Sequence, residues 1–483
     1  MRKAVMIAAT GSGSGKTTIT SGLLEMFSED GISVSAYKCG PDYIDPMFHR
    51  RVIGVPSENL DLFLAGEEKV REIFKRREKE TEFAVVEGVM GLYDGTSPSS
   101  EEASSYHLAS VLDIPIILVV DAGGMGRSIL AVIRGFLSMD KESRIKGIFL
   151  NRISDSYFMK IKPVIEEEIG IPVVGHLSKM EKETFSGRHL GLKMPSEIPE
   201  LKNMLETIAG KLRDGLETER FLQIARLDTE GSDEKENNQD VNKTNTKESS
   251  QNRKQENVPD TERTTRPGVR IAVARDEAFC FYYEENLRML EEAGAILVDF
   301  SPLHDKEIPS DVDGILLGGG YPELFAKELS RNTSMLKSVK ERIEAGMPSL
   351  AECGGFLYLH EGLDVDGKIY PMVGVTSGNG YNKGKLVRFG YVELSEKESA
   401  FLDSSKESGQ SIRGHEFHYY DTDDNGKDAI CRKRSTGAVW EAACIGENHW
   451  WGFAHLYYPS NENFPKRFVE KCEIYKEKRE KRV

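Results

Sequence analysis

Residues 4–18 read AVMIAATGSGSGKTT, and this stretch decides the fold of the first half of the chain. Its first seven residues are apolar or small, which is typical of a parallel strand buried on both faces. A glycine-rich turn follows, and the amphipathic segment 17–27 comes directly after it. Glycines allow backbone N–H groups to wrap phosphates at a helix N-terminus. The stretch therefore predicts a strand, a phosphate-binding loop (P-loop) and a helix.

The end of this loop carries the residue types that hold a nucleoside triphosphate. Lys16 is expected to reach the β- and γ-phosphates, and the Thr17 hydroxyl to ligate Mg²⁺. Gly13, Gly15 and Thr18 complete the predicted phosphate cradle. Thr10 stands where P-loops usually have their first glycine. Position 11 is glycine, where ATPases that switch by dimerising carry lysine, so the loop looks more like that of synthetases similar to dethiobiotin synthetase.

Working outward, the same pattern repeats up to about residue 227. Short apolar runs bounded by Gly, Pro or Asp alternate with amphipathic stretches, which predicts a doubly wound α/β domain over residues 1–227. The expected further strands are FAVVEG (83–88), IPIILVVDA (114–122), IKGIFLN (145–151) and IPVVGHL (171–177), and the expected helices include 17–27 and 103–112.

Carboxylates follow two of the predicted strands. The segment KCGPDYIDP (38–46) follows a further predicted strand, SVSAYK (33–38), and contains Asp42 and Asp45. Glu87 lies at the end of FAVVEG, where ligand sites of α/β sheets lie. Thr17, Asp42 and Glu87 are expected to form the Mg²⁺ site. Asp94 follows on the loop after Glu87. A turn-capping role remains open for Asp94, and also for Asp121 at the end of IPIILVVDA.

The run from Asp228 to Gly268 is rich in Asp, Glu, Lys, Asn, Gln, Ser and Thr, with two Val and no Leu, Ile, Met or aromatic residue. Such a segment buries too little apolar surface to offset its ordering entropy, which predicts a flexible linker over 228–268. The strand pattern resumes with VRIAVAR (269–275), AILVDF (295–300) and GILLGGG (314–320). Residues 269–483 are therefore predicted to form a second α/β domain.

Cys353 lies in PSLAECGGF (348–356), between a predicted buried strand and a glycine turn. This arrangement is typical of a nucleophile elbow, where the turn exposes the sulfur and the following helix N-terminus lowers its pKa. The N–H of Gly354 is a candidate oxyanion donor, with a second from Gly319 or Gly320. The pattern predicts a cysteine amidotransferase of class I.

A general base is also required, and His455 in WGFAHLYY is the expected one. His415 and His418 in GHEFHY are the alternatives, with roles in lining the acceptor site or in packing left open. Most class I amidotransferases have glutamate two residues after the histidine, where this chain has Tyr457. The catalytic set is therefore expected to be a dyad, or another group orients the imidazole.

Together the two motif sets resemble the a,c-diamide synthases that act on cobyrinic acid, hydrogenobyrinic acid or Ni-sirohydrochlorin. The resemblance rests on TGSGSGKTT, KCGPDYIDP, VVEGVMGLYDG, SGRHLGL (186–192), ARDEAFCFYYEENL, LGGGYPEL, AECGGF, GHEFHY and AHLYY. It implies that Mg·ATP phosphorylates the a- and c-acetate carboxylates of cobyrinic acid or a related tetrapyrrole. Ammonia released from L-glutamine at Cys353 then displaces the phosphate. The resemblance also assigns Tyr43, Ile44, Asp45 and Asp94 to positions near the acceptor and phosphate.

Two alternatives remain at this stage: amidation of Ni-sirohydrochlorin, or a nucleotide-switched binding protein with a degenerate glutaminase-like module. The net charge of −15 disfavours nucleic acid as a partner. No run approaches the roughly 18–20 apolar residues of a membrane span. Six cysteines without a CxxC pair indicate a reducing cytoplasm. The oligomeric state is left open, with a homodimer as one option.

Overall fold

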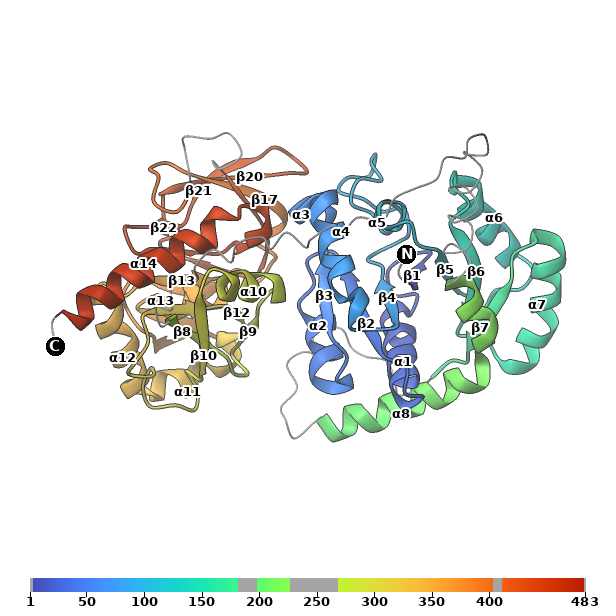
Figure 1. Cartoon of the computed structure of the whole chain (residues 1–483), viewed down its shortest axis with the longest axis horizontal. Helices are drawn as coiled ribbons and strands as arrows, with labels where there is room; N and C mark the ends of the chain where they lie inside the picture. The colour runs from blue at the N-terminus through green and yellow to red at the C-terminus, as the bar shows by residue number, and fades with distance from the viewer. Residues whose placement is uncertain (1–2, 181–197, 226–267, 403–410, 482–483) are drawn as a thin grey trace, which may run out of the picture.

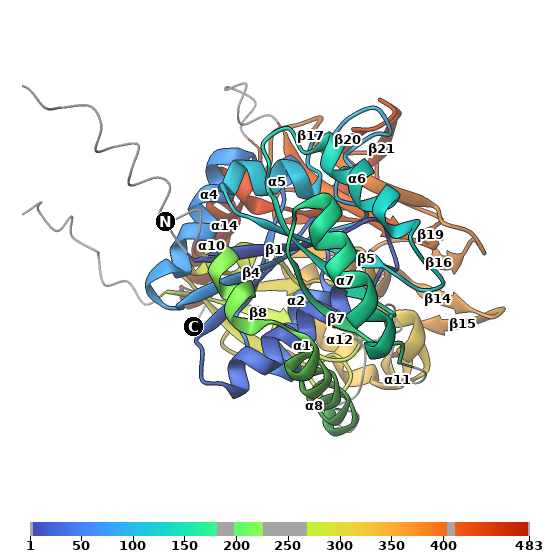
Figure 2. The same ribbon diagram turned by 90° about the vertical axis from the view of Figure 1, so that its right-hand side faces the viewer.

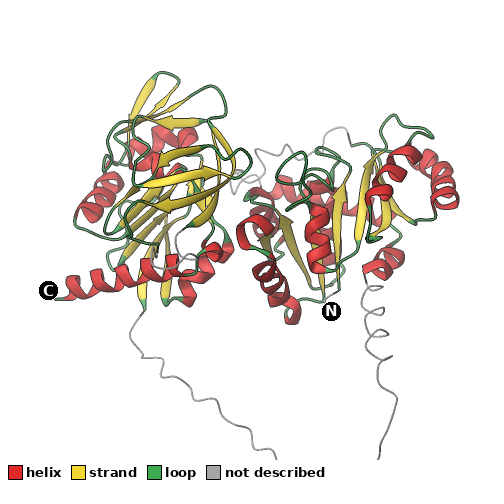
Figure 3. Cartoon of the chain, turned by 90° about the horizontal axis from the view of Figure 1, so that it is seen from above, coloured by secondary structure: helices red, strands yellow, loops and turns green. Residues whose placement is uncertain are grey.

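The computed structural model describes residues 3–180, 198–225, 268–402 and 411–481, which form two α/β lobes (Figure 1). The N-terminal lobe, blue to green, and the C-terminal lobe, yellow to red, lie side by side. In both lobes helices flank the strands (Figure 3). The predicted linker 228–268 lies outside the described residues apart from Gly268, as does the segment 186–192. Among the described helices, none is long and apolar enough to cross a membrane.

The N-terminal lobe is built on a seven-stranded parallel sheet of order β3-β2-β4-β1-β5-β6-β7. The six strands predicted at 4–10, 33–38, 83–88, 114–122, 145–151 and 171–177 are all present, as β1, β2, β4, β5, β6 and β7. The strands are β1 (Ala4–Ala9), β2 (Val34–Cys39), β3 (Ser57–Leu60), β4 (Phe83–Glu87), β5 (Ile116–Asp121), β6 (Ile145–Asn151) and β7 (Val173–Leu177). The helices are α1 (Lys16–Glu29), α2 (Ile44–Phe48), η1 (His49–Ile53), α3 (Leu62–Ala65), α4 (Glu67–Arg76), η2 (Arg77–Lys79), α5 (Ser105–Leu112), α6 (Ile129–Met139), α7 (Asp155–Ile169) and α8 (Ile198–Gly215).

The central strand β1 is buried on both faces, as its continuous apolarity predicts. Met6 and Ala8 pack in a core shared with α4, α5, α6 and α7. Val5 and Ile7 point to the opposite face, into a core shared with α1 and α8. Figure 2 views this lobe from the side of α6 and α7. Because β1 lies between β4 and β5, the loop after it opens at the switch point of the sheet, where ligands bind.

The C-terminal lobe has a six-stranded sheet of order β10-β8-β11-β13-β23-β22 and a five-stranded antiparallel sheet of order β21-β20-β17-β18-β24. A four-stranded sheet (β15-β14-β16-β19) and a ribbon (β12-β9) complete it. The strands are β8 (Val269–Ala274), β9 (Phe279–Phe281), β10 (Ala295–Phe300), β11 (Gly314–Leu317), β12 (Gly319–Gly320), β13 (Ser349–Glu352), β14 (Gly362–Val365), β15 (Lys368–Pro371), β16 (Asn379–Asn382), β17 (Arg388–Glu396), β18 (Ile412–His418), β19 (Tyr420–Thr422), β20 (Ala429–Lys433), β21 (Val439–Ala442), β22 (Cys444–Ile445), β23 (His449–Gly452) and β24 (His455–Leu456). The helices are α10 (Glu284–Glu292), η4 (Pro322–Phe325), α11 (Ala326–Arg331), α12 (Thr333–Glu344), α13 (Gly354–Leu359), η6 (Tyr458–Ser460) and α14 (Asn463–Glu480).

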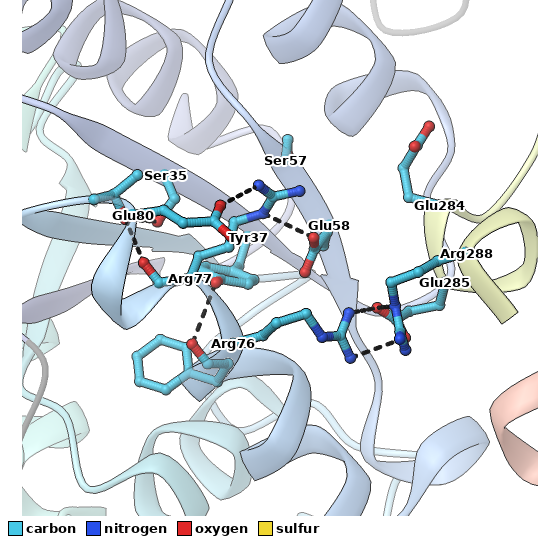
Figure 4. Close-up of polar contacts among 12 residues, drawn as sticks. Ser35, Tyr37, Ser57, Glu58, Arg76, Arg77, Glu80, Glu284, Glu285 and Arg288 are labelled. Atoms are coloured by element: carbon cyan, nitrogen blue, oxygen red, sulfur yellow. Dashed lines mark hydrogen bonds and ion pairs between the residues drawn. The ribbon is translucent and has the colours of Figure 1, made fainter. Parts of the chain in front are cut away.

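The two lobes are joined by ion pairs and by an apolar cluster. Arg76 of α4 contacts the carboxylate of Glu285 on α10 (Figure 4), and Arg50 pairs with Glu284 at 2.9 Å. Beside these pairs, an aromatic and apolar cluster contains residues of both lobes, namely Tyr43, Phe63, Leu64, Tyr283, Tyr391 and Tyr457. The side chains that the N-terminal lobe contributes to this interface therefore come from the segments that follow β2 and β3.

Candidate active site

The predicted phosphate loop connects β1 to α1. Gly13 and Gly15 have positive φ angles of 76° and 94°, and a Cβ on Gly15 would lie 2.1 Å from the Asn151 side chain. Lys16 folds back over the loop, where its Nζ donates to the carbonyl oxygens of Gly11 (3.2 Å) and Met90. Burial, reinforced by the charge of Lys38, lowers the pKa of Lys16 to about 8. The loop is thus shaped to present N–H groups and one lysine to a phosphate chain.

A cavity of about 630 Å³ opens beside this loop, lined by Gly15, Thr18, Asn151, Arg152, Leu177, Ser178, Lys179 and Met180. Asn151 donates to the Ser14 carbonyl at 2.8 Å, and Arg152 donates to that of Gly13 at 2.9 Å. Asp121 holds the Arg152 guanidinium at 2.5 Å. Asn151 and Arg152 were not predicted from the sequence as site residues, although Asn151 ends the predicted strand 145–151 and Arg152 follows it.

Two of the three residues expected to hold Mg²⁺ contact each other. The Thr17 hydroxyl donates to Glu87 Oε1 at 2.7 Å, and Glu87 Oε2 is buried without a hydrogen-bond partner. Asp42 lies on the neighbouring loop, where its Oδ1 accepts the N–H groups of Ile44 (2.8 Å) and Asp45 (3.2 Å). An unpaired buried carboxylate oxygen beside a hydroxyl fits a hard cation that prefers oxygen ligands.

Lys38 is a further residue at this site that was not predicted from the sequence. Its buried Nζ lies 2.6 Å from Glu87 and 2.5 Å from Asp45. Burial raises the pKa of Glu87 to about 7 even with Lys38 beside it. For Asp45 burial acts in the same direction, but the Lys38 ammonium outweighs it and lowers the pKa. Lys38 thus neutralises carboxylates at the point where the phosphate loop and the 38–46 loop meet.

The residues predicted to lie near the acceptor and phosphate have different surroundings. Three of them lie on the 38–46 loop, which Asn59 stabilises by donating to the carbonyl oxygens of Gly40 and Asp42 at 2.9 and 2.7 Å. Ile44 packs against an apolar cluster around Phe48. Asp94 accepts the Gly91 N–H at 2.8 Å, which is the turn-capping role left open above.

Cys353 lies at the turn between β13 and α13, as predicted. Its φ of 48° and ψ of −103° are strained for a residue with a side chain and fit a nucleophile elbow. The expectation of a lowered thiol pKa is wrong for the free protein, because burial raises the pKa of Cys353 more than the Gly354 N–H lowers it. Cys353 therefore needs a neighbouring base to become a thiolate.

The glycine loop of β12 packs against this elbow. A Cβ on Gly354 would lie 3.0 Å from the Gly320 nitrogen, so the two backbones are in close contact. Gly320 has a φ of 155°, and a Cβ there would lie 2.0 Å from the Ala278 carbonyl. A Cβ on Gly319 would lie 2.3 Å from the His455 ring. Glycine is thus required where the candidate oxyanion donors approach the cysteine and the histidine.

His455 lies on β24, next to His415 of β18 in the sheet. Burial, reinforced by His415 and His418, lowers the pKa of His455 to about 3, so its ring is neutral at neutral pH. His418 is stacked on Phe453 at 4.0 Å and has its Nδ1 2.6 Å from the Tyr420 carbonyl, which is a packing role. His455 Nδ1 lies 3.8 Å from the Glu352 carboxylate.

Tyr43 connects the two predicted sites. It belongs to the 38–46 loop of the N-terminal lobe, yet its ring lies 5.3 Å from Phe281, 4.4 Å from Tyr283 and 5.0 Å from His455. The acceptor loop of one lobe is therefore in direct contact with the candidate base of the other. Such an arrangement can generate ammonia beside an activated carboxylate without exposing it to bulk water.

Comparison with known proteins matches each lobe to a known domain family. Residues 5–189 match the CobQ/CobB/MinD/ParA nucleotide binding domain, and residues 270–460 match the CobB/CobQ-like glutamine amidotransferase domain. Cobyrinate a,c-diamide synthase of Caldanaerobacter subterraneus is 37% identical over 98% of this chain and 99% of its own length. The enzyme of the same name from Priestia megaterium is 35% identical over 98% of both chains.

Another relative of that name, from Picrophilus torridus, is 36% identical over 97% of this chain and 98% of its own. Among solved structures, PurLQS from Thermotoga maritima is 18% identical over 43% of this chain and 99% of its own, with a TM-score of 0.30. The full-length relatives span the phosphate loop, the acceptor loop, the cysteine elbow and His455 alike. The chain belongs to the cobyrinate a,c-diamide synthase family.

Proposed function

We propose that this chain amidates the a- and c-acetate carboxylates of cobyrinate in cobalamin biosynthesis, using ATP and glutamine. The observation that carries the proposal is the near full-length similarity to relatives named for this reaction, which extends over both lobes. The contact of the 38–46 loop with His455 supports it further, because ammonia released from glutamine has to reach the activated carboxylate.

The N-terminal lobe activates the carboxylate. The acceptor carboxylate attacks the γ-phosphorus of ATP, so that an acyl phosphate forms and ADP leaves. Lys16 and the loop N–H groups at Gly13, Gly15 and Thr18 bind the phosphates, and Lys38 balances the charge of Glu87 and Asp45. Thr17, Glu87 and Asp42 would hold Mg²⁺, which when bound neutralises developing phosphate charge.

The C-terminal lobe supplies ammonia. His455 takes the thiol proton as the Cys353 sulfur attacks the amide carbon of glutamine. N–H groups at Gly320 and Gly354 stabilise the resulting oxyanion. The C–N bond then breaks, the proton passes from His455 to the leaving ammonia, and water hydrolyses the thioester to glutamate. Ammonia attacks the acyl phosphate, and phosphate leaves.

The alternatives raised by the sequence are less well supported. The relatives are named for cobyrinate, so Ni-sirohydrochlorin is not favoured as the acceptor. A nucleotide-switched binding protein would not need the strained Cys353 elbow beside a neutral, buried histidine.

The test is mass spectrometry of the products formed from cobyrinate, Mg·ATP and glutamine. We expect two successive replacements of a carboxyl hydroxyl by an amino group, each accompanied by one ADP. The same assay with Ni-sirohydrochlorin is the comparison. Hydrolysis of ATP and glutamine without any mass change in cobyrinate would reject the acceptor while keeping the two half-reactions.

Two variants separate the half-reactions. Cys353→Ala should abolish amidation with glutamine but retain it with an ammonium salt, because only the nitrogen source is lost. Lys16→Ala should lose amidation with either nitrogen source. Glutamine-dependent product from the first variant, or normal ATP turnover by the second, would contradict the assigned roles.

A further inference from the structure

A row of aromatic side chains, exposed at Phe389 and Phe417 and partly buried at Tyr391 and His415, lies on one face of the β17–β18 pair, and no step described so far uses it. The strand register places Phe389 opposite Phe417 and Tyr391 opposite His415. Residues at these alternate positions share one face of the sheet. We call these four residues the aromatic strip. In the described part of the chain, Phe389 (52% exposed) and Phe417 (42%) are the only exposed phenylalanines.

Neighbouring rings of the strip lie close together, and Phe389 and Phe417 at its outer end are exposed. Ring centroids are 5.6 Å apart for Phe389 and Phe417, 5.8 Å for Phe389 and His415, and 5.8 Å for Tyr391 and His415. The opposite face of the strands is buried in the core through residues such as Val392 and Leu394. A group of neighbouring exposed aromatic rings is typical of a binding surface.

The inner end of the strip leads to the nucleotide site. Tyr391 donates to Asp61 of the N-terminal lobe at 2.7 Å, and its hydroxyl lies 3.9 Å from where a Cβ on Gly40 would be. The same Cβ on Gly40 would lie 3.8 Å from the Val89 side chain. The neighbouring residue Met90 accepts a hydrogen bond from Lys16. A ligand lying on the strip would thus extend toward the place where the acyl phosphate forms.

We propose that the macrocycle of the acceptor packs against the aromatic strip. This proposal rests on the function proposed above. The acceptor is a broad ring with largely apolar faces and carboxylates on its rim. Aromatic side chains can pack against such a face, and this contact carries no charge requirement. A rim carboxylate would then point along the strip toward Lys16. Small dicarboxylic acids, which lack the macrocycle, would gain nothing from the strip.

The test is the double variant Phe389→Ser/Phe417→Ser, assayed with cobyrinate. We expect KM and the equilibrium dissociation constant for cobyrinate to rise about tenfold or more, because two stacking surfaces are lost. Glutamine hydrolysis without acceptor should be unchanged. Phe389→Trp/Phe417→Trp should retain affinity. Ile369→Ser, at another exposed apolar side chain (55%), is the matched control and should bind normally.

Unchanged cobyrinate affinity in the serine variant overturns the proposal. So does unchanged affinity together with dissociation of a dimer in sedimentation, which would identify the strip as a contact between copies. Failure of the wild-type protein to amidate cobyrinate would instead reject the proposed function.

A second, independent observation concerns Glu352, the residue before the nucleophile. His455 Nδ1 is buried and has no hydrogen-bond partner, and the Glu352 carboxylate faces it at 3.8 Å. The N–H of Leu456, which follows His455, holds that carboxylate. Tyr457 occupies the position where most class I amidotransferases have glutamate.

We infer that Glu352 is the positioning residue for His455. When the ring accepts the Cys353 proton at Nε2, its Nδ1–H donates to the Glu352 carboxylate. This bond selects the tautomer whose Nε2 is free to act as base. Burial raises the pKa of Glu352 to about 8, so the group is largely protonated at neutral pH until the imidazolium forms beside it and favours the carboxylate.

Glu352→Gln tests this role, with Glu396→Gln as the control because the Glu396 carboxylate also accepts backbone N–H groups away from the site. We expect kcat for glutamine hydrolysis to fall by about ten-thousandfold, as for a variant that leaves the wrong histidine tautomer, with KM little changed. The ¹⁵N shifts of His455 should report the other tautomer, and ammonium-dependent amidation should persist. Unaltered ¹⁵N shifts, or a similar loss in the control, would overturn the assignment.

Discussion

At the scale of single residues, side chains far apart in the sequence meet at the nucleotide site. Thr17 bonds Glu87, and Lys16 reaches the loop that follows Glu87. Lys38 escaped prediction because its partner Glu87 is 49 residues away and nothing in the sequence around a strand-end lysine specifies such a pairing. Motifs with a fixed spacing can be predicted, whereas a buried ion pair depends on the packing of neighbouring strands.

Lys38→Met tests how far this ion pair supports the site. The variant leaves Glu87 and Asp45 buried together without a counter-charge, so we expect a loss of about 3–5 kcal/mol in the free energy of unfolding. Amidation with both glutamine and ammonium should be lost. Urea denaturation and the product assay measure the two effects. Lys69→Met removes only surface ion pairs and should cost about 1 kcal/mol or less.

At the scale of elements, the cysteine elbow and all strands of the N-terminal lobe except β3 were predicted, while strand partners in the C-terminal lobe were not. The apolar stretch 450–458 divides into the end of β23 and the separate β24. These two strands belong to different sheets. A local apolar pattern shows that a strand is buried, but pairing is decided by contacts distant in the chain.

Gly319→Ala tests the fit of the β12 loop against β24. The added methyl group would lie 2.3 Å from the His455 ring and must displace it. Glutamine hydrolysis should fall by about a hundredfold or more, since a small misplacement of a base is costly. Ammonium-dependent amidation is the internal control and should remain. Full glutaminase activity would mean that the ring tolerates the shift.

At the scale of the whole molecule, the sequence predicted two domains, with a boundary in a polar segment, but not how they meet. The contacts between lobes pair residues from unrelated motifs, such as Arg50 with Glu284 and Tyr391 with Asp61. Composition and periodicity describe each lobe by itself. Docking depends on surface side chains whose partners lie hundreds of positions away.

Tyr391→Phe probes this docking through pH. Burial raises the pKa of Asp61 to about 6, so the group is a carboxylate at higher pH and then depends on the Tyr391 O–H. Losing that donor should destabilise the protein by about 1–3 kcal/mol at about pH 8 and by less at about pH 5, where Asp61 is protonated. Thermal unfolding across this range provides the measurement. Tyr93→Phe, which loses a bond to the neutral Phe136 carbonyl, should show no such trend.

Tyr43→Ala should uncouple the half-reactions. Removing the ring opens the contact between the acceptor loop and His455, so more glutamine should be hydrolysed per amide formed. Tyr43→Phe keeps the ring and should keep the ratio near that of the wild type. Glutamate and amide are quantified in the same reaction. An unchanged ratio in the alanine variant would show that the stack does not retain ammonia.

The contact of Tyr43 with His455, Phe281 and Tyr283 has a consequence for protein engineering. A chimera that joins this N-terminal lobe to another glutaminase at the linker would lose the surface on which Tyr43 rests. The 38–46 loop and the aromatic residues facing it have to be transplanted as one unit. Recombination libraries for new acceptors should therefore place their crossovers around that unit, and not at the polar segment between the lobes.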